Sequence, residues 1–279
     1  MGTIYLYAVM AGEPQLNLGS IGLPDGSTAV DTLVADGLTA VVSEYSGPPL
    51  EELPKPAYLA RLLLHQQVLE KIVAHHTALP VRFGTVLRSV DDARTVVTRY
   101  RSQLIEALEE MGNAVEIDLS ATWDLSAVLD TIKAGPAIAE LKNAAGESPQ
   151  DALAAAIEAG SLAQRALEQQ REAYRRRVVS GLARFVQDAE PHALPSDETV
   201  FNIAFLVERG DLEAFDSTLE EMGPSFEPSL SFRYVGPLPP YSFATVEISY
   251  PNAAAIETAR QLLGLGERAT HSELRASYR

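Results

Sequence analysis

The chain has 279 residues, carries a formal net charge of −16 and is 46% apolar. This length suits two ordinary domains or one large one, and this apolar content predicts a packed core rather than disorder. The acidic balance argues against nucleic acid and anionic membranes as partners, and the absence of cysteine excludes disulfides and thiolate chemistry.

The first predicted elements are two strands and a long helix. Residues 4–9 are typical of a strand, and residues 38–43 of a buried strand that follows a turn at Gly37. A proline-rich stretch, residues 48–56, then precedes the helix. The apolar residues expected together on one face of that helix are Leu59, Leu62, Leu63, Leu69 and Val73.

A short strand, a second helix and a further strand follow. Residues 79–85 form the short strand, and Ser89 begins a helix that Gly112 ends. Residues 114–123 alternate between apolar and polar side chains, which predicts the last strand of this region. We therefore expect residues 1–124 to form an N-terminal ferredoxin-like α+β sandwich.

The remainder, residues 125–279, is predicted to be a C-terminal domain, a variant of the ferredoxin-like fold with additional helices. The expected parts are a helical region, 125–190, with its best helix over about 161–186; a βαββ unit, 196–250, with strands at 199–207, 229–235 and 242–250; and a helical tail, 251–279. The fold class is therefore α+β, in two domains.

The chain shows no signal for a membrane or for export. No window approaches the roughly 20 apolar residues of a membrane span. The N-terminus lacks the basic region of a signal peptide. These features predict a soluble cytoplasmic protein.

The sequence offers no convincing catalytic, metal or cofactor site. His65 and His76 lie eleven residues apart on the predicted helix, which is roughly 16 Å and too far to share a metal ion. Residues 264–269 match a dinucleotide-binding pattern by letter, but they follow a helical stretch instead of a strand. Acidic pairs such as residues 109–110 fit solvated helix faces. We predict no enzyme, no metal site and no cofactor.

Three polar or proline-rich features each allow two interpretations. Arg82 lies in an apolar strand, where it is either a structural residue or a contact on an exposed sheet face. The arginines at 175–177 either solvate a helix or form a docking patch for an acidic partner. Residues 236–240 either connect two strands rigidly or form a polyproline-like recognition segment.

Two segments far apart in the chain carry a resemblance. His65-Gln66-Gln67-Val68-Leu69-Glu70, with Leu79-Pro80-Val81-Arg82-Phe83-Gly84-Thr85-Val86 after it, makes up the first part, and Gly236-Pro237-Leu238-Pro239-Pro240-Tyr241-Ser242-Phe243 makes up the second. Together they resemble the gas vesicle protein F/L family. The positions that carry the motif, as structural or interface residues, are His65, Leu79, Pro80, Arg82, Phe83, Gly84, Gly236, Pro237, Pro239, Pro240, Tyr241, Ser242 and Phe243.

The resemblance implies a minor structural or assembly role in gas vesicles, the gas-filled protein shells that give some microbes buoyancy. It implies two domains, no catalytic residues, and a location in the cytoplasm at the gas vesicle. The implied partners are the small hydrophobic shell protein and other accessory gas vesicle proteins. Leu238 departs from the family pattern, where an aromatic residue is expected, and the helical region 125–190 matches weakly.

Two functions of other classes stay open. One is a small-molecule-sensing regulatory module built on ferredoxin-like domains, and the other is a hydrolase with an unrecognised site. The tail raises a separate point, because residues 259–279 resemble the opening of a J-domain but stop before its His-Pro-Asp loop. We expect two short or frayed helices there without co-chaperone activity, and a chance likeness is the alternative.

Overall fold

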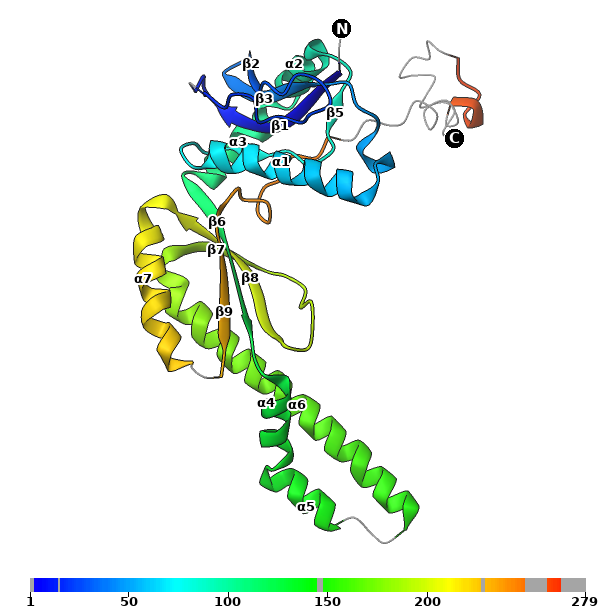
Figure 1. Cartoon of the computed structure of the whole chain (residues 1–279), viewed down its shortest axis with the longest axis vertical. Helices are drawn as coiled ribbons and strands as arrows, with labels where there is room; N and C mark the ends of the chain where they lie inside the picture. The colour runs from blue at the N-terminus through cyan, green and yellow to red at the C-terminus, as the bar shows by residue number, and fades with distance from the viewer. Residues whose placement is uncertain (1–2, 15, 145–147, 227–228, 249–259, 267–279) are drawn as a thin grey trace. The chain divides into compact units, whose positions relative to one another are not determined.

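The computed structural model describes residues 3–14, 16–144, 148–226, 229–248 and 260–266. The chain divides into two compact units, Met1–Val246 and Glu247–Arg279, and the first unit holds both sheets (Figure 1). The chain combines helices with two antiparallel sheets, which confirms the predicted α+β class. The predicted division at residue 124 stays a prediction.

The first sheet has the strand order β2-β3-β1-β4, and β5 also pairs with β1. Its strands are β1 (Thr3–Ala11), β2 (Asp31–Ala35), β3 (Leu38–Tyr45), β4 (Leu79–Pro80) and β5 (Val86–Leu87). The hairpin of β2 and β3 closes at Asp36 and Gly37, whose φ angles of 50° and 79° match a two-residue hairpin turn. The helices with this sheet are α1 (Lys55–Val73), α2 (Val90–Arg99) and α3 (Arg101–Met111), and a short 3-10 turn spans Leu50–Glu52.

The second sheet has the strand order β7-β8-β6-β9. Its strands are β6 (Ala114–Thr122), β7 (Val186–Pro191), β8 (Thr199–Glu208) and β9 (Ser231–Leu238). Its helices are α4 (Leu125–Lys133), α5 (Pro136–Ala144), α6 (Pro149–Leu182) and α7 (Leu212–Met222), with 3-10 turns at Ala183–Phe185, Arg209–Asp211 and Gly223–Ser225. In Figure 1, α6 and α7 run along this sheet, and α4 and α5 pair with the first half of α6.

The strand at residues 114–122 corrects one expectation. It was predicted to end the first sheet, but β6 pairs with β8 and β9 in the second. Alternation of apolar and polar residues shows that a strand has one buried face, and it does not show which strands lie beside it. Here the odd-numbered face of β6, with Ile117 and Leu119, packs into the same apolar cluster as Phe205 of β8.

The predicted strand over residues 242–250 is also wrong for the part that the structure describes. Tyr241–Phe243 form a turn, in which the Phe243 and Ala244 amides donate to the Pro240 carbonyl at 3.2 and 2.8 Å. Only Val246 makes a β-bridge, a parallel one to Val81 beside the first sheet. The prolines before this turn lack the amide protons that a strand ladder needs, so the chain leaves β9 there.

Two helix expectations change as well. The single helix expected between Ser89 and Gly112 is two, α2 and α3, because Tyr100 has a ψ of 16°. The Ser89 cap is as predicted, since its hydroxyl accepts the Asp92 amide at 3.1 Å. Gly112 ends α3 as expected, but its φ of 53° and ψ of −120° differ from a left-handed helical cap.

In α1 the predicted apolar face is divided. Leu69 and Val73 are buried, but Leu59 and Leu63 are 44% and 60% exposed. The buried stripe runs instead through His65, Val68, Leu69, Ile72 and Val73.

None of the helices in the described part of the chain is long and apolar enough to cross a membrane. Of the J-domain-like tail, only residues 260–266 are described. A helical turn ends there at Gly264, with φ 64°, while the amide of Leu265 donates to the Arg260 carbonyl at 3.0 Å. The remainder of that prediction lies outside the described residues.

Candidate functional site

The first motif segment surrounds a buried histidine. His65 of α1 is 2% exposed, and its Nδ1 lies 2.9 Å from the Tyr5 hydroxyl. The Gly84 amide donates to the same hydroxyl at 3.2 Å, so the hydroxyl proton is directed to Nδ1. The Tyr7 ring stacks on the imidazole and the Phe83 ring meets it edge-on, with centroids 5.7 and 5.5 Å away. His65 therefore belongs to a packed aromatic cluster.

Burial sets the protonation of this cluster. Desolvation lowers the pKa of His65 to about 4, and the Val81 carbonyl opposes that shift only in part. Desolvation also raises the pKa of Tyr5 far above its ordinary value. At neutral pH both groups are uncharged, which suits a structural hydrogen bond between them.

The second motif segment runs from β9 toward the first sheet. A Cβ at Gly236 would lie 2.5 Å from Ile117 Cδ1 and 3.1 Å from the Glu116 carbonyl, so β9 approaches β6 more closely there than a side chain allows. Further on, Tyr241 packs against the core of the first sheet. The amide and hydroxyl of Ser242 donate to the two Glu116 carboxylate oxygens at 2.7 and 2.9 Å.

The two motif segments meet beside β4. The Val246 amide donates to the Pro80 carbonyl at 2.8 Å, and the Arg82 amide donates to the Val246 carbonyl at 2.9 Å. The Arg82 side chain is exposed, and its structural or contact role stays a prediction. The structure thus brings Pro80 and Arg82 together with Val246, which follows the second motif segment, and the role of the motif positions stays a proposal.

The three arginines at 175–177 contact a glutamate of their own helix, α6, and Phe226, which follows the 3-10 turn at Gly223–Ser225. Arg175 and Arg176 form ion pairs with Glu172 at 2.8 and 3.2 Å. The Arg177 guanidinium lies 4.4 Å from the centre of the Phe226 ring. These contacts favour helix solvation over a docking patch.

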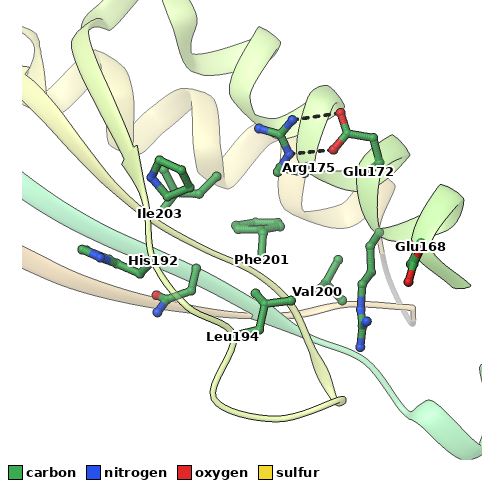
Figure 2. A pocket seen from close by; sticks show the side chains of 11 residues that line it. Glu168, Glu172, Arg175, His192, Leu194, Val200, Phe201 and Ile203 are labelled. Carbon is green, nitrogen blue, oxygen red and sulfur yellow. Dashed lines mark hydrogen bonds and ion pairs between the residues drawn. The ribbon is translucent and has the colours of Figure 1, made fainter.

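A cavity of about 360 Å³ lies at the edge of the second sheet. Figure 2 shows the Arg175–Glu172 pair of α6 at one side of it and the side chains of Phe201 and Leu194 at the other. The lining residues are Glu168, Arg171, Glu172, Arg175, Pro191, His192, Leu194, Val200, Phe201, Asn202 and Ile203. Its apolar floor and charged rim could hold a small amphipathic group.

His192 also meets Ser242 in an arrangement that invites comparison with a hydrolase. Its Nε2 lies 3.2 Å from the Ser242 hydroxyl and 3.9 Å from Asp118 Oδ1. In a catalytic triad the acid holds the other ring nitrogen, and the serine hydroxyl is free to attack. Here the acid and the serine share Nε2, and the hydroxyl is hydrogen-bonded to Glu116. The geometry therefore does not support the hydrolase alternative.

One face of α1 exposes apolar side chains. Tyr58, Leu59 and Leu63, which we call the α1 apolar row, are 36%, 44% and 60% exposed. The Tyr58 ring meets the Phe83 ring edge-on at 5.2 Å, so the row adjoins the aromatic cluster. Exposed apolar residues gathered on one helix mark a candidate contact surface for a protein partner.

Comparison with known proteins decides the family. The model of the gas vesicle synthesis protein GvpL/GvpF family matches residues 3–245. The chain belongs to this family. Gas vesicle protein F of Streptomyces sp. (strain CB03234) is 29% identical over 245 residues, covering 86% of this chain and 98% of that protein. Gas vesicle protein F of Nostoc sp. (strain PCC 7120) is 25% identical over 252 residues, covering 87% and 98%.

Solved structures of family members share the fold. The crystal structure of GvpF from Anabaena sp. PCC7120 superposes with a TM-score of 0.72 at 23% identity, covering 90% of this chain and 99% of that chain. GvpF from Microcystis aeruginosa gives a TM-score of 0.71 at 20% identity, with 88% and 100% covered. The resemblance drawn from the two motif segments is therefore confirmed.

Sequence reasoning missed the group formed by Glu116, Asp118 and His192. The two acids stand two residues apart on one strand, a spacing that places both on one face. That spacing could have predicted that Glu116 and Asp118 lie side by side. Nothing in the sequence placed His192 beside them, because the pairing of β7 with β8 brings it there.

Proposed function

We propose that this protein acts in gas vesicle assembly by binding the hydrophobic shell protein, together with other accessory gas vesicle proteins, in the cytoplasm and at the growing vesicle. The observation that carries the proposal is the family match over residues 3–245. The proposed role is structural and not enzymatic, in agreement with the names of the relatives, which are gas vesicle proteins.

The α1 apolar row supports the proposal physically. A shell subunit that keeps a gas-facing surface dry is strongly apolar and prone to aggregate before assembly. An acidic protein with a net charge of −16 stays soluble and can still cover part of that surface with exposed apolar side chains. Leu59 and Leu63 lie one helical turn apart, as a helix-on-helix contact requires.

The experiment is co-expression with the shell protein, followed by pull-down of either partner under conditions that keep the shell protein soluble. The wild-type chain should retain the shell protein, and the double variant Leu59→Ser/Leu63→Ser should lose most of it. The matched control is Leu153→Ser/Ile157→Ser on α6, whose side chains are 63% and 62% exposed. Absence of the shell protein from wild-type pull-downs, with positive controls working, would refute the proposal.

A small-molecule-sensing module is the second candidate, and the cavity beside α6 is the observation that favours it. A bound metabolite would raise the melting temperature, because a ligand that binds only the folded state stabilises it. A screen of metabolites should then give a shift that Phe201→Ala abolishes. A screen in which no metabolite changes the melting temperature would favour the assembly role.

A further inference from the structure

Three side chains with metal-binding atoms converge on one face of the second sheet. Glu116 and Asp118 are two residues apart on β6, and His192 directly follows β7. Asp118 of β6 pairs with Ala204 of β8, and Ala204 pairs with Glu190 of β7. The small Ala204 side chain therefore lies between Asp118 and the edge strand β7. One ligand atom from each of the three residues lies within 4.8 Å of the other two.

Within the described residues, His192 is the one basic side chain that faces the two acids of this group at ion-pair distance. Glu116 is 2% exposed, and its hydrogen-bond partners are the neutral amide and hydroxyl of Ser242. Among the described residues, no lysine or arginine forms an ion pair with Glu116 or Asp118, and Arg233 of β9 only attracts Asp118 from a distance. Burying a carboxylate without a cation costs several kcal/mol by order of magnitude, so the group favours a positive partner.

One atom of Asp118, whose side chain is 36% exposed, adds a second indication. Its Oδ1 atom is inaccessible to water, has no hydrogen-bond partner within the described residues, and lies 3.9 Å from His192 Nε2. That separation is too long for a hydrogen bond. Two ligands of one tetrahedral zinc ion, each at about 2.0–2.1 Å from it, lie about 3.4 Å apart. The spacing is therefore close to that of two atoms with an ion between them, and a bound ion would replace the 3.2 Å contact that Nε2 makes with the Ser242 hydroxyl.

We propose that Glu116, Asp118 and His192 form a binding site for one divalent metal ion, with Zn²⁺ the ion that best fits the ligands. Imidazole nitrogen favours zinc and other transition metals over Mg²⁺ and Ca²⁺, and carboxylate oxygen binds zinc as well. Three protein ligands also leave a position for water or for a group from a partner. Ser242 orients the Glu116 carboxylate through two hydrogen bonds, as residues behind metal ligands commonly do.

The position of the site suggests what the ion does. Its ligands come from a central strand and from the end of an edge strand, and Ser242 ties Glu116 to the segment that continues to Val246 and the first sheet. The ion would therefore stabilise the place where this segment leaves β9 and joins β4. This role is independent of shell-protein binding and can be measured on the protein alone.

The test uses the full chain after dialysis against a chelator. Calorimetric titration with ZnCl₂ should show one ion bound per chain and a rise in melting temperature. Asp118→Asn and His192→Gln should each weaken zinc binding about tenfold or more. His75→Gln/His76→Gln, which changes the two histidines that follow α1, is the control and should bind zinc as the wild type does.

Cobalt gives a second measurement that does not depend on stability. Co²⁺ bound by nitrogen and oxygen ligands in tetrahedral geometry should give the wild type a strong visible absorption, and His192→Gln should lose it. Asp118 and His192 are partly exposed, so both variants should keep the wild-type circular dichroism spectrum. Failure of the wild type to bind, or equal affinity and equal cobalt spectra in wild type and variants, would overturn the proposal.

Discussion

The two sheets bury polar groups in different ways. Beneath the first sheet, Tyr5 and His65 share a hydrogen bond as neutral groups inside an aromatic cluster. On the second sheet, Glu116 is buried beside Asp118 with only hydroxyl, amide and imidazole partners. A neutral pair buries no net charge, although His65 Nε2 has no hydrogen-bond partner within the described residues, whereas a pair of ionised acids needs a proton or a cation from outside. The first cluster therefore indicates stability, and the second indicates a ligand.

The largest expected effect lies on the opposite, apolar face of the second sheet. Phe205 of β8 is fully buried and meets Phe215 of α7 at 5.9 Å between ring centres. Phe205→Ala should cost about 3–5 kcal/mol of unfolding free energy because it opens a cavity in that core. Urea denaturation measures the loss. A cost below about 1 kcal/mol would mean that α7 does not depend on this contact.

The next prediction concerns pH and the first sheet. His65 has a pKa of about 4 when folded and about 6.5 when unfolded, so the unfolded chain binds more protons between those values. Its contribution is complete above about pH 6.5 and falls by about 3 kcal/mol as the pH drops toward 4.

Denaturation at pH 7 and pH 4.5, in wild type and in His65→Gln, isolates this contribution from that of other groups. The variant should lose less stability on acidification than the wild type does. His75→Gln, a change at an exposed position, should lose as much stability between pH 7 and pH 4.5 as the wild type does. An equal loss of unfolding free energy between pH 7 and pH 4.5 in wild type and His65→Gln would show that water reaches the imidazole and that the cluster is open.

Phe83 should have a smaller effect than Phe205. Its ring contacts Tyr5, Tyr58 and His65 but is only partly buried. Phe83→Ala should therefore cost roughly 2 kcal/mol, below the 3–5 kcal/mol of a fully buried phenylalanine. A loss under about 0.5 kcal/mol together with weaker binding of the shell protein would assign Phe83 to the contact surface.

The smallest expected effect is at Arg176. Its side chain is 69% exposed, and its ion pair with Glu172 is solvated. Arg176→Gln should change neither the urea midpoint nor the amount of shell protein retained. A clear loss of binding without a loss of stability would restore the docking-patch interpretation of residues 175–177.

The sequence predicted most elements where local signals were strong. The start of α2 at Ser89, the end of α3 at Gly112 and the strand β8 follow from residue types at fixed positions. The strand β2 had a signal that was overlooked, since Asp36-Gly37 is a preferred hairpin turn. The failures concern pairing: neither the placement of β6 nor the route of residues 239–246 is encoded in local periodicity.

The candidate metal site could not be predicted for the same reason. Its acids belong to β6, its histidine follows β7, and β8 lies between them. Only the register of three strands brings the ligands together. The family was recognised because resemblance carries information about long-range contacts that a single segment lacks, and the role of the motif positions stays a proposal.

The place of β6 in its sheet has a consequence for synthesis. Both of its neighbours, β8 and β9, are encoded after it, so a nascent chain presents β6 with two unpaired edges and an apolar face. At ordinary elongation rates of 5–20 residues per second, this exposure lasts on the order of ten seconds. An open strand of this kind pairs readily with other chains. The newly made chain thus passes through a period in which β6 is open to pairing with other chains.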